Sequence, residues 1–290
     1  MFIFDHIIFY RIGRFLAEHL PVNLSYLIAI VISDIHYLFA HQDRREVTQN
    51  LKVIFPKKNK KEIAKIRIRL FRNFAKYLVD FFRFSKLDNR YIEEKVIIEN
   101  IDYLKEALSK GKGVIGLTAH LGNWELGGIL MAMLGYPIWA VALPHRDRRV
   151  DEFFNLQRER KGLNVIPIED ASKRCIYLLK QKKIIALLGD RDFTQNGIKI
   201  DFFNRPTLFP LGPAIFSLRT GAPIVPAFMI RRYKDYFALK FEKPIYPVRK
   251  SNLEDSIKEL ILQYKCIFEK YIQRYPEQWY MFRKFWSQDK

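Results

Sequence analysis

The sequence predicts an α/β protein: a central, largely parallel mixed sheet flanked by helices, with an apolar helical arm at its N-terminal end. Short apolar runs alternate with helical segments from about residue 100 onward, which is typical of a parallel sheet with helical crossovers. The chain has 290 residues and is 49% hydrophobic, so it can bury a substantial core. We divide it into an N-terminal helical region at 1–95 and an α/β core with a C-terminal helix at 96–290.

Residues 1–40 are mostly apolar and predict one or two helices, with Pro21 able to begin the second. Leu20–Leu38 is interrupted by polar residues such as Asn23 and Asp34. A membrane-spanning helix needs about 20 consecutive apolar residues. We therefore favour an interfacial or partly inserted helix over a true span, with an ordinary buried helix as the alternative. No pattern of a cleaved signal peptide is visible.

Glu62–Phe84 has apolar residues at three- and four-residue spacing, which predicts an amphipathic helix. Its other face carries lysines and arginines. A helix packed on the core with a solvated outer face is the simpler interpretation. A membrane-docking helix is the functional alternative, and together with the apolar arm it makes 1–95 a candidate membrane-associating region.

Beyond residue 100, glycines mark the ends of several predicted helices, at Gly111, Gly135 and Gly221. The predicted strands are Val114–Thr118, Ile138–Leu143, Asn164–Ile168, Ile184–Leu188, Ile200–Phe203, Ile224–Met229 and Tyr236–Glu242. The predicted helices are Asp102–Ser109, Asn123–Leu134, Asp151–Lys161, Ala171–Gln181, Pro213–Arg219 and Ser251–Arg274. Ser251 and Glu254 have the spacing of a capping box at the start of the last helix.

The chain is strongly basic, with 50 Lys and Arg against 31 Asp and Glu and a net charge of +19. Such an excess favours anionic partners. It is rich in Phe and Tyr, a mixture that suits both a bilayer interface and nucleic acid. The two cysteines, Cys175 and Cys266, form no Cys-x-x-Cys pattern, which excludes a disulfide framework; we expect both to be buried thiols.

His120 is the most informative of the six histidines, because it follows a predicted strand and precedes a glycine turn. Ligands collect at the carboxyl ends of strands in open α/β sheets. Glu125 lies five residues on, and on one continuous helix the two side chains would diverge. Gly122 can turn the chain so that they meet. Asn123 can cap the following helix and is also a candidate for contact with the substrate. The pattern predicts an imidazole base with a carboxylate partner, against the alternative of a structural histidine.

Two charged groups are further candidates for substrate binding. Asp190, Arg191 and Asp192 directly follow the predicted strand Ile184–Leu188, where a salt-bridged loop is the alternative. The basic candidates are Arg146, Arg158 and Arg160. Arginine binds phosphate through its forked guanidinium, although most residues of this group are expected to form a solvated face.

The block from Thr118 to Glu125 resembles the His-x4-Asp/Glu motif of the glycerolipid acyltransferase superfamily. Its Gly-Asn-Trp-Glu form is similar to the branch that contains the late acyltransferases of lipid A biosynthesis and the phosphatidylinositol mannoside acyltransferases. Three further segments resemble that branch in the same order: Arg44 to Pro56, Asp190 to Phe203, and Pro276 to Tyr280. The chain departs from it at Asn204, where glycine is usual, and at Arg283, where the lipid A branch often has histidine.

The resemblance implies an O-acyltransferase at the cytoplasmic face of a bacterial inner membrane, peripheral or held by a single N-terminal anchor. It would move a fatty acyl chain from acyl carrier protein or acyl-CoA, without another cofactor, to a hydroxyl of an anionic glycolipid such as a lipid A precursor. A phosphatidylinositol mannoside or another lysolipid is the alternative acceptor. The resemblance implies that His120 is the base and Glu125 its partner. It also implies that Arg158 or Arg160, with Asp190 or Asp192, completes the site.

Three other functions compete with this interpretation. A metal hydrolase would use His120, Glu125, Asp190 and Asp192 as ligands, but zinc sites normally contain more His or Cys, so we expect no metal. A nucleic-acid binder is suggested by charge alone, and no recognised motif supports it. A non-enzymatic lipid-binding protein would not depend on His120.

Overall fold

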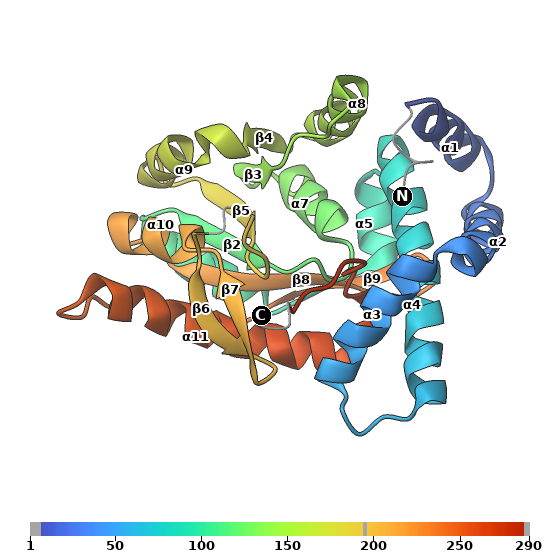
Figure 1. Ribbon diagram of the computed structural model, residues 1–290. Coiled ribbons are helices and arrows are strands. Elements are labelled where there is room, and N and C mark those ends of the chain that lie inside the picture. Colours follow the sequence, from blue (N-terminus) through green and yellow to red (C-terminus); the bar gives the residue numbers. More distant parts are fainter. Residues whose placement is uncertain (1–6, 194–195, 287–290) are drawn as a thin grey trace.

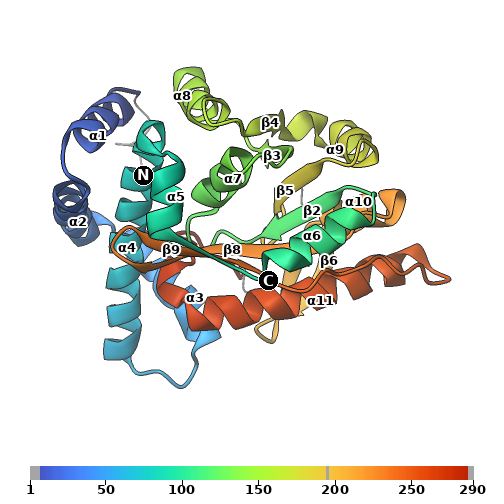
Figure 2. The same cartoon turned by 180° about the vertical axis from the view of Figure 1, so that it is seen from behind.

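The computed structural model describes residues 7–193 and 196–286, and Figures 1 and 2 show it from opposite sides. The helices are α1 (Ile7–His19), α2 (Val22–Phe39), α3 (His41–Ile54), α4 (Lys60–Phe82), α5 (Asn89–Lys95), α6 (Ile101–Ser109), α7 (Trp124–Met133), α8 (Arg148–Glu159), α9 (Ala171–Lys180), α10 (Gly212–Thr220) and α11 (Leu253–Arg274). The strands are β1 (Val96–Glu99), β2 (Val114–Thr118), β3 (Ile138–Ala142), β4 (Asn164–Pro167), β5 (Ile184–Leu188), β6 (Ile198–Phe202), β7 (Arg205–Phe209), β8 (Ile224–Tyr233) and β9 (Tyr236–Phe241).

In the described residues the central sheet has seven strands in the order β1-β9-β8-β2-β5-β3-β4. The strands from β8 to β4 run parallel, whereas β9 is antiparallel to β8 and β1 follows the direction of β9. This mixed, largely parallel sheet confirms the predicted fold class. The hairpin β6–β7 stands apart from it. Because β2 lies between β8 and β5, its carboxyl end is near the middle of the sheet.

The two faces of the sheet are covered by different helices. Alternate residues of a strand point to opposite faces, so on β5 Ile184 packs into one hydrophobic cluster while Ile185 packs into another. The first of these clusters contains residues of α6, α7, α8 and the N-terminal helices α1, α2 and α4. The second contains residues of α9, α10 and α11. The N-terminal helices therefore share a core with the sheet.

Helices α1 and α2 stand at one edge of the molecule (Figure 1) and expose much of their apolar surface. We call this surface the apolar face; its exposed residues are Ile8, Phe9, Ile12, Phe15, Leu16, Leu24, Leu27, Val31, Ile32, Ile35, Leu38 and Phe39. Among the described helices α2 alone is both long and apolar enough to cross a membrane, by length and composition only. Pro21 is its N-cap, as the sequence indicated.

Several sequence predictions of local structure are corrected. Helix α3 and the strands β1 and β7 were not predicted. The cap of α11 is Asn252, whose side chain accepts from Glu254 N, so the proposed capping box at Ser251 is wrong. Cys175 is buried, but Cys266 is exposed because it lies on the outer side of α11.

Candidate active site

The centre of the site is a hydrogen-bonded pair, His120 and Asp190. His120 follows β2 and Asp190 follows β5, the strand beside it, and Gly189 N donates to Thr118 O at 2.8 Å to hold the two strand ends together. His120 Nδ1 lies 2.8 Å from Asp190 Oδ1, and the backbone N–H of His120 donates to Oδ2 at 3.0 Å. The carboxyl ends of two parallel strands thus bring an imidazole and a carboxylate together.

The carboxylate of Asp190 is fully buried, with 0% of the residue exposed. Burial by itself would raise the pKa of Asp190. The charge of His120 and the hydrogen bonds from the His120 ring, the Trp279 indole and the His120 backbone lower the pKa by more than burial raises it. The pKa of Asp190 is therefore below its ordinary value. Asp190 is therefore an anion fixed against one ring nitrogen. Such an anion orients an imidazole and stabilises its protonated form.

Glu125 is not the partner of His120, and this corrects the sequence prediction. Arg158 Nε donates to Glu125 Oε2 at 2.9 Å and Arg158 Nη2 donates to Oε1 at 2.6 Å, a bidentate ion pair with both side chains buried. No hydrogen bond joins His120 to Glu125 in the described residues. Five residues of separation leave Glu125 in the first turn of α7, where it faces α8 rather than the imidazole.

The glycine turn between His120 and α7 is present as the sequence predicted, but it does not bring His120 and Glu125 together. Gly122 has φ +70°, and a Cβ there would lie 2.1 Å from Met229 O, so only glycine fits. Asn123 caps α7 by accepting from Leu126 N, and its amide donates to Asp80 Oδ2 at 2.9 Å. Asn123 is 1% exposed and so has a structural role here rather than the predicted contact with substrate.

The segment from Pro276 to Trp286 completes the site from the far end of the sequence. Gly122 N donates to Gln278 O, Tyr280 N donates to His120 O, and Trp279 Nε1 donates to Asp190 Oδ2 at 3.1 Å. Spacing and composition could not place this segment beside His120. The one available signal was its resemblance to a Pro-Glu-Gln-Trp block.

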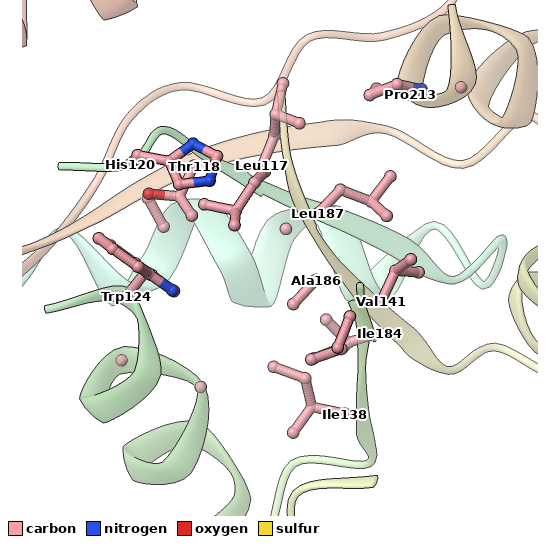
Figure 3. A pocket seen from close by; sticks show the side chains of 18 of the residues that line it. Leu117, Thr118, His120, Trp124, Ile138, Val141, Ile184, Ala186, Leu187 and Pro213 are labelled. Carbon is pink, nitrogen blue, oxygen red and sulfur yellow. The ribbon is translucent and has the colours of Figure 1, made fainter. Parts of the chain in front are cut away.

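A cavity of about 450 Å³ opens beside His120 and extends between α7 and the sheet. Figure 3 shows His120, Thr118 and Trp124 at one end of it and Ile138 and Ile184 deeper inside. Most of its lining is apolar. His120 is one of a small number of polar or charged side chains in that lining.

Small residues in register create this space. Gly116 on β2 pairs with Ala186 on β5, and Ala186 pairs with Ala140 on β3. Three neighbouring strands therefore carry only glycine or alanine at the same level of the sheet. On the helix that faces them, Gly127 and Gly128 also line the cavity. A sheet and a helix with larger residues at these positions would pack together and close the space.

The structure separates the other predicted residues into two groups. Arg191 and Asp192 line the cavity, and Asp192 Oδ2 accepts from Gly197 N at 3.2 Å. Arg146 and Arg160 are exposed and do not line it. In the described part of the chain, no group of three or more His, Cys, Asp or Glu side chains is arranged to hold a metal ion.

Comparisons with known proteins agree with these motifs over nearly the whole chain. Residues 3–288 match the family described as bacterial lipid A biosynthesis acyltransferase. The chain is similar to a phosphatidylinositol mannoside acyltransferase of Mycolicibacterium smegmatis, with 26% identity over 224 residues that cover 75% of this chain and 71% of that one.

Two further proteins are more distant. A lipid A biosynthesis acyltransferase of Haemophilus influenzae is 21% identical over 241 residues, covering 83% of this chain and 74% of its own. The crystal structure of the 1-acyl-sn-glycerophosphate acyltransferase from Thermotoga maritima aligns with a TM-score of 0.40 and 16% identity, covering 86% of this chain and 97% of that one. The match of the family to residues 3–288 settles membership: the chain belongs to the bacterial lipid A biosynthesis acyltransferase family and is an acyltransferase.

Proposed function

We propose that the protein transfers a fatty acyl chain from acyl carrier protein or acyl-CoA to a hydroxyl of an anionic glycolipid at a membrane surface. The observation that carries this proposal is the His120–Asp190 pair at the mouth of an apolar cavity. A lipid A precursor is the first candidate acceptor. A phosphatidylinositol mannoside is the second, because the relative from Mycolicibacterium smegmatis bears that name.

In the proposed mechanism His120 acts as a general base. Its Nδ1–H donates to Asp190, which leaves Nε2 to accept a proton. Nε2 takes the proton of the acceptor hydroxyl as the oxygen attacks the thioester carbonyl. The tetrahedral intermediate then expels the thiolate, which receives that proton from the imidazolium. Asp190 stabilises the imidazolium in between, so no covalent intermediate on the protein is required.

The cavity is the proposed site of the acyl chain. Its volume of about 450 Å³ is within the range of small-molecule pockets, about 300–1,000 Å³. An apolar chain bound there gains about 25 cal/mol for each Å² of apolar surface removed from water. Because the cavity begins at His120, a chain that fills it presents its carbonyl carbon beside the proposed base.

The apolar face of α1 and α2 is the proposed membrane contact. A row of exposed Leu, Ile and Phe residues is costly in water and suits the acyl region of a bilayer. The net charge of +19 adds attraction to anionic lipid. The cytoplasmic face of a bacterial inner membrane, where acyl thioesters are made, is the proposed location.

The test is an acyl-transfer assay in mixed micelles with purified full-length protein. Each donor is paired with each of two acceptors, a lipid A precursor and a phosphatidylinositol mannoside, and the products are identified by mass spectrometry. We expect transfer to at least one acceptor and its loss in His120→Ala, while the matched control His41→Ala, on the exposed start of α3, stays active. Full activity of His120→Ala in a correctly folded preparation would contradict the proposed base.

A further inference from the structure

A buried hydroxyl without a partner lies at the His120 end of the cavity. Thr118 Oγ1 is buried, and among the described residues it has no hydrogen-bond partner. In the described part of the chain the same holds for side-chain atoms of Glu46, Arg231 and Tyr264, but none of these residues lines the cavity, whereas Thr118 does. An unpaired buried hydroxyl lowers the stability of the fold, so its presence beside the site calls for an explanation.

Strand β2 directs the side chain of Thr118 to the cavity. Successive residues of a strand point to opposite faces of the sheet. Ile115 and Ala119 belong to the hydrophobic cluster on one face, whereas Gly116, Thr118 and His120 line the cavity on the other. Figure 3 shows Thr118 beside His120 at the same end of that cavity. One short segment therefore presents both the hydroxyl and the proposed base to the same space.

The place of Thr118 along β2 matches the place of the thioester group. Thr118 lies between His120 at the opening and Gly116 in the row of small residues deeper in the cavity. An acyl chain that fills the cavity runs past Gly116 and has its carbonyl carbon beside His120. Its carbonyl group therefore lies next to Thr118, and the hydroxyl is the polar side chain that the chain of the donor meets before it reaches the base.

We propose that Thr118 Oγ1 donates a hydrogen bond to the carbonyl oxygen of the bound acyl thioester, which makes Thr118 a catalytic residue in addition to His120. This inference rests on the proposed function and adds a group that acts on the carbonyl. As the acceptor oxygen bonds to the carbonyl carbon, the π electron pair moves onto the carbonyl oxygen. The hydrogen bond strengthens as that negative charge develops and weakens when the double bond re-forms and the thiolate leaves. Thr118 keeps its proton throughout.

The contacts of His120 favour this role over a covalent one for Thr118. A hydroxyl nucleophile is activated by a hydrogen bond to a general base. In the part of the chain that the structure describes, no hydrogen bond joins Thr118 to His120, and Nδ1 of the ring is bound to Asp190. The hydroxyl can therefore donate to the substrate. In a mostly apolar cavity one such donor acts strongly on a developing charge, because little solvent screens it.

The experiment compares two substitutions of Thr118 in the acyl-transfer assay with full-length protein. Thr118→Val removes the hydroxyl and keeps the shape of the side chain, whereas Thr118→Ser keeps the hydroxyl. The matched control is Thr207→Val. Thr207 is a buried residue of strand β7 that does not line the cavity, and its hydroxyl donates to Arg205 O at 3.0 Å. Steady-state kinetics and chemical denaturation are measured for each protein.

We expect Thr118→Val to lower kcat about 10²- to 10³-fold, as the loss of one donor to an oxyanion does, with little change in the KM for the acceptor. Its free energy of unfolding should stay the same or rise, because a methyl group replaces an unpaired buried hydroxyl. Thr118→Ser should recover most of the activity, and Thr207→Val should keep the kcat of wild type. A stable Thr118→Val with wild-type kcat would overturn the inference, as would an acyl group attached to Thr118 after incubation with donor alone.

A spectroscopic measurement separates this inference from the proposed function. A fatty acyl-CoA that is isotopically labelled at the thioester carbonyl is bound without acceptor, and its carbonyl band is recorded by infrared difference spectroscopy. A hydrogen bond to the carbonyl oxygen lowers the stretching frequency, so the band should lie lower in wild type than in Thr118→Val. If wild type acylates neither acceptor but shows this shift, the proposed function fails and the carbonyl contact stands. If wild type acylates an acceptor and the two bands coincide, the contact fails and the function stands.

Discussion

At the scale of single residues, the site depends on which carboxylate reaches the imidazole. Asp190 contacts both the ring and the backbone of His120, whereas both oxygens of Glu125 are bound by Arg158. The two carboxylates therefore have different expected roles. We expect Asp190 to stabilise the protonated ring of His120. We expect the ion pair of Glu125 and Arg158 to position α7 and α8 around the cavity.

Asp190→Asn should lower kcat by about 10²- to 10⁴-fold, because the amide no longer stabilises the imidazolium. The measurement is kcat at saturating donor and acceptor. An unchanged kcat in a folded variant would show that Asp190 does not act on the base.

Protonation of Asp190 at acidic pH should also lower the free energy of unfolding. Its pKa is lower in the folded protein than the usual value of about 3.9, so the stability it contributes is fully present above that value and is lost as the pH falls through the folded pKa. Chemical denaturation between pH 7 and pH 3 measures this. The free energy of unfolding of Asp190→Asn should depend less on pH in the acid range than that of wild type. The same pH dependence in both proteins would show that Asp190 does not contribute to it.

Glu125→Ala should cost about 3–5 kcal/mol of unfolding free energy, because it leaves the buried Arg158 without a counter-ion. Its activity should fall as the cavity walls loosen. Glu159→Ala, an exposed change in the same helix as Arg158, is the matched control. A fall in kcat as large as that of Asp190→Asn, with unchanged stability, would return Glu125 to the role of base partner.

At the scale of elements, we expect β2 and α7 to determine the length of acyl chain that the cavity can hold. Gly116 has room for a Cβ, which would make ordinary van der Waals contacts at 3.9 Å with Ile184 Cγ2 and with Ile185 O. The residue sits in the small-residue row that faces α7. A larger side chain at this position enters the cavity without disturbing the strand, and β-branched residues are favoured in strands.

Gly116→Ala and Gly116→Val should shift donor preference stepwise towards shorter acyl chains. Discrimination by one methylene in an apolar pocket corresponds to about 10- to 200-fold in kcat/KM. The measurement is competition between donors of different chain length, with product masses read by mass spectrometry. Unchanged chain-length preference in Gly116→Val would place the acyl chain elsewhere.

At the scale of the whole molecule, the apolar face and the positive charge should act together on a membrane. Leu27→Glu and Ile35→Glu alter side chains of α2 that are 58% and 54% exposed, so folding should be preserved. Each should weaken binding to anionic vesicles about tenfold or more, since burying such a side chain contributes about 1.5–3 kcal/mol. Vesicle co-sedimentation measures this.

The control for membrane binding is Tyr177→Glu on α9. Tyr177 is 61% exposed, and α9 lies on the opposite side of the molecule from α1 and α2 (Figure 1). It should bind vesicles as wild type does. If it weakens binding as much as Leu27→Glu, net charge rather than the apolar face governs attachment.

The sequence by itself determined what depends on nearest neighbours along the chain. Apolar periodicity defined most helices and strands, Gly122 and Asn123 defined the turn after His120, and the order of motifs indicated the family. These features arise from local backbone and side-chain preferences that act within a few residues.

Only the tertiary structure decided which side chains meet. Asp190 lies 70 residues from His120, and Trp279 lies 89 residues from Asp190. They converge because β5 pairs with β2 and the segment after α11 folds back over both strand ends. The cavity depends in the same way on the register that aligns Gly116, Ala186 and Ala140. Strand pairing joins residues distant in the chain, and no local pattern encodes that choice.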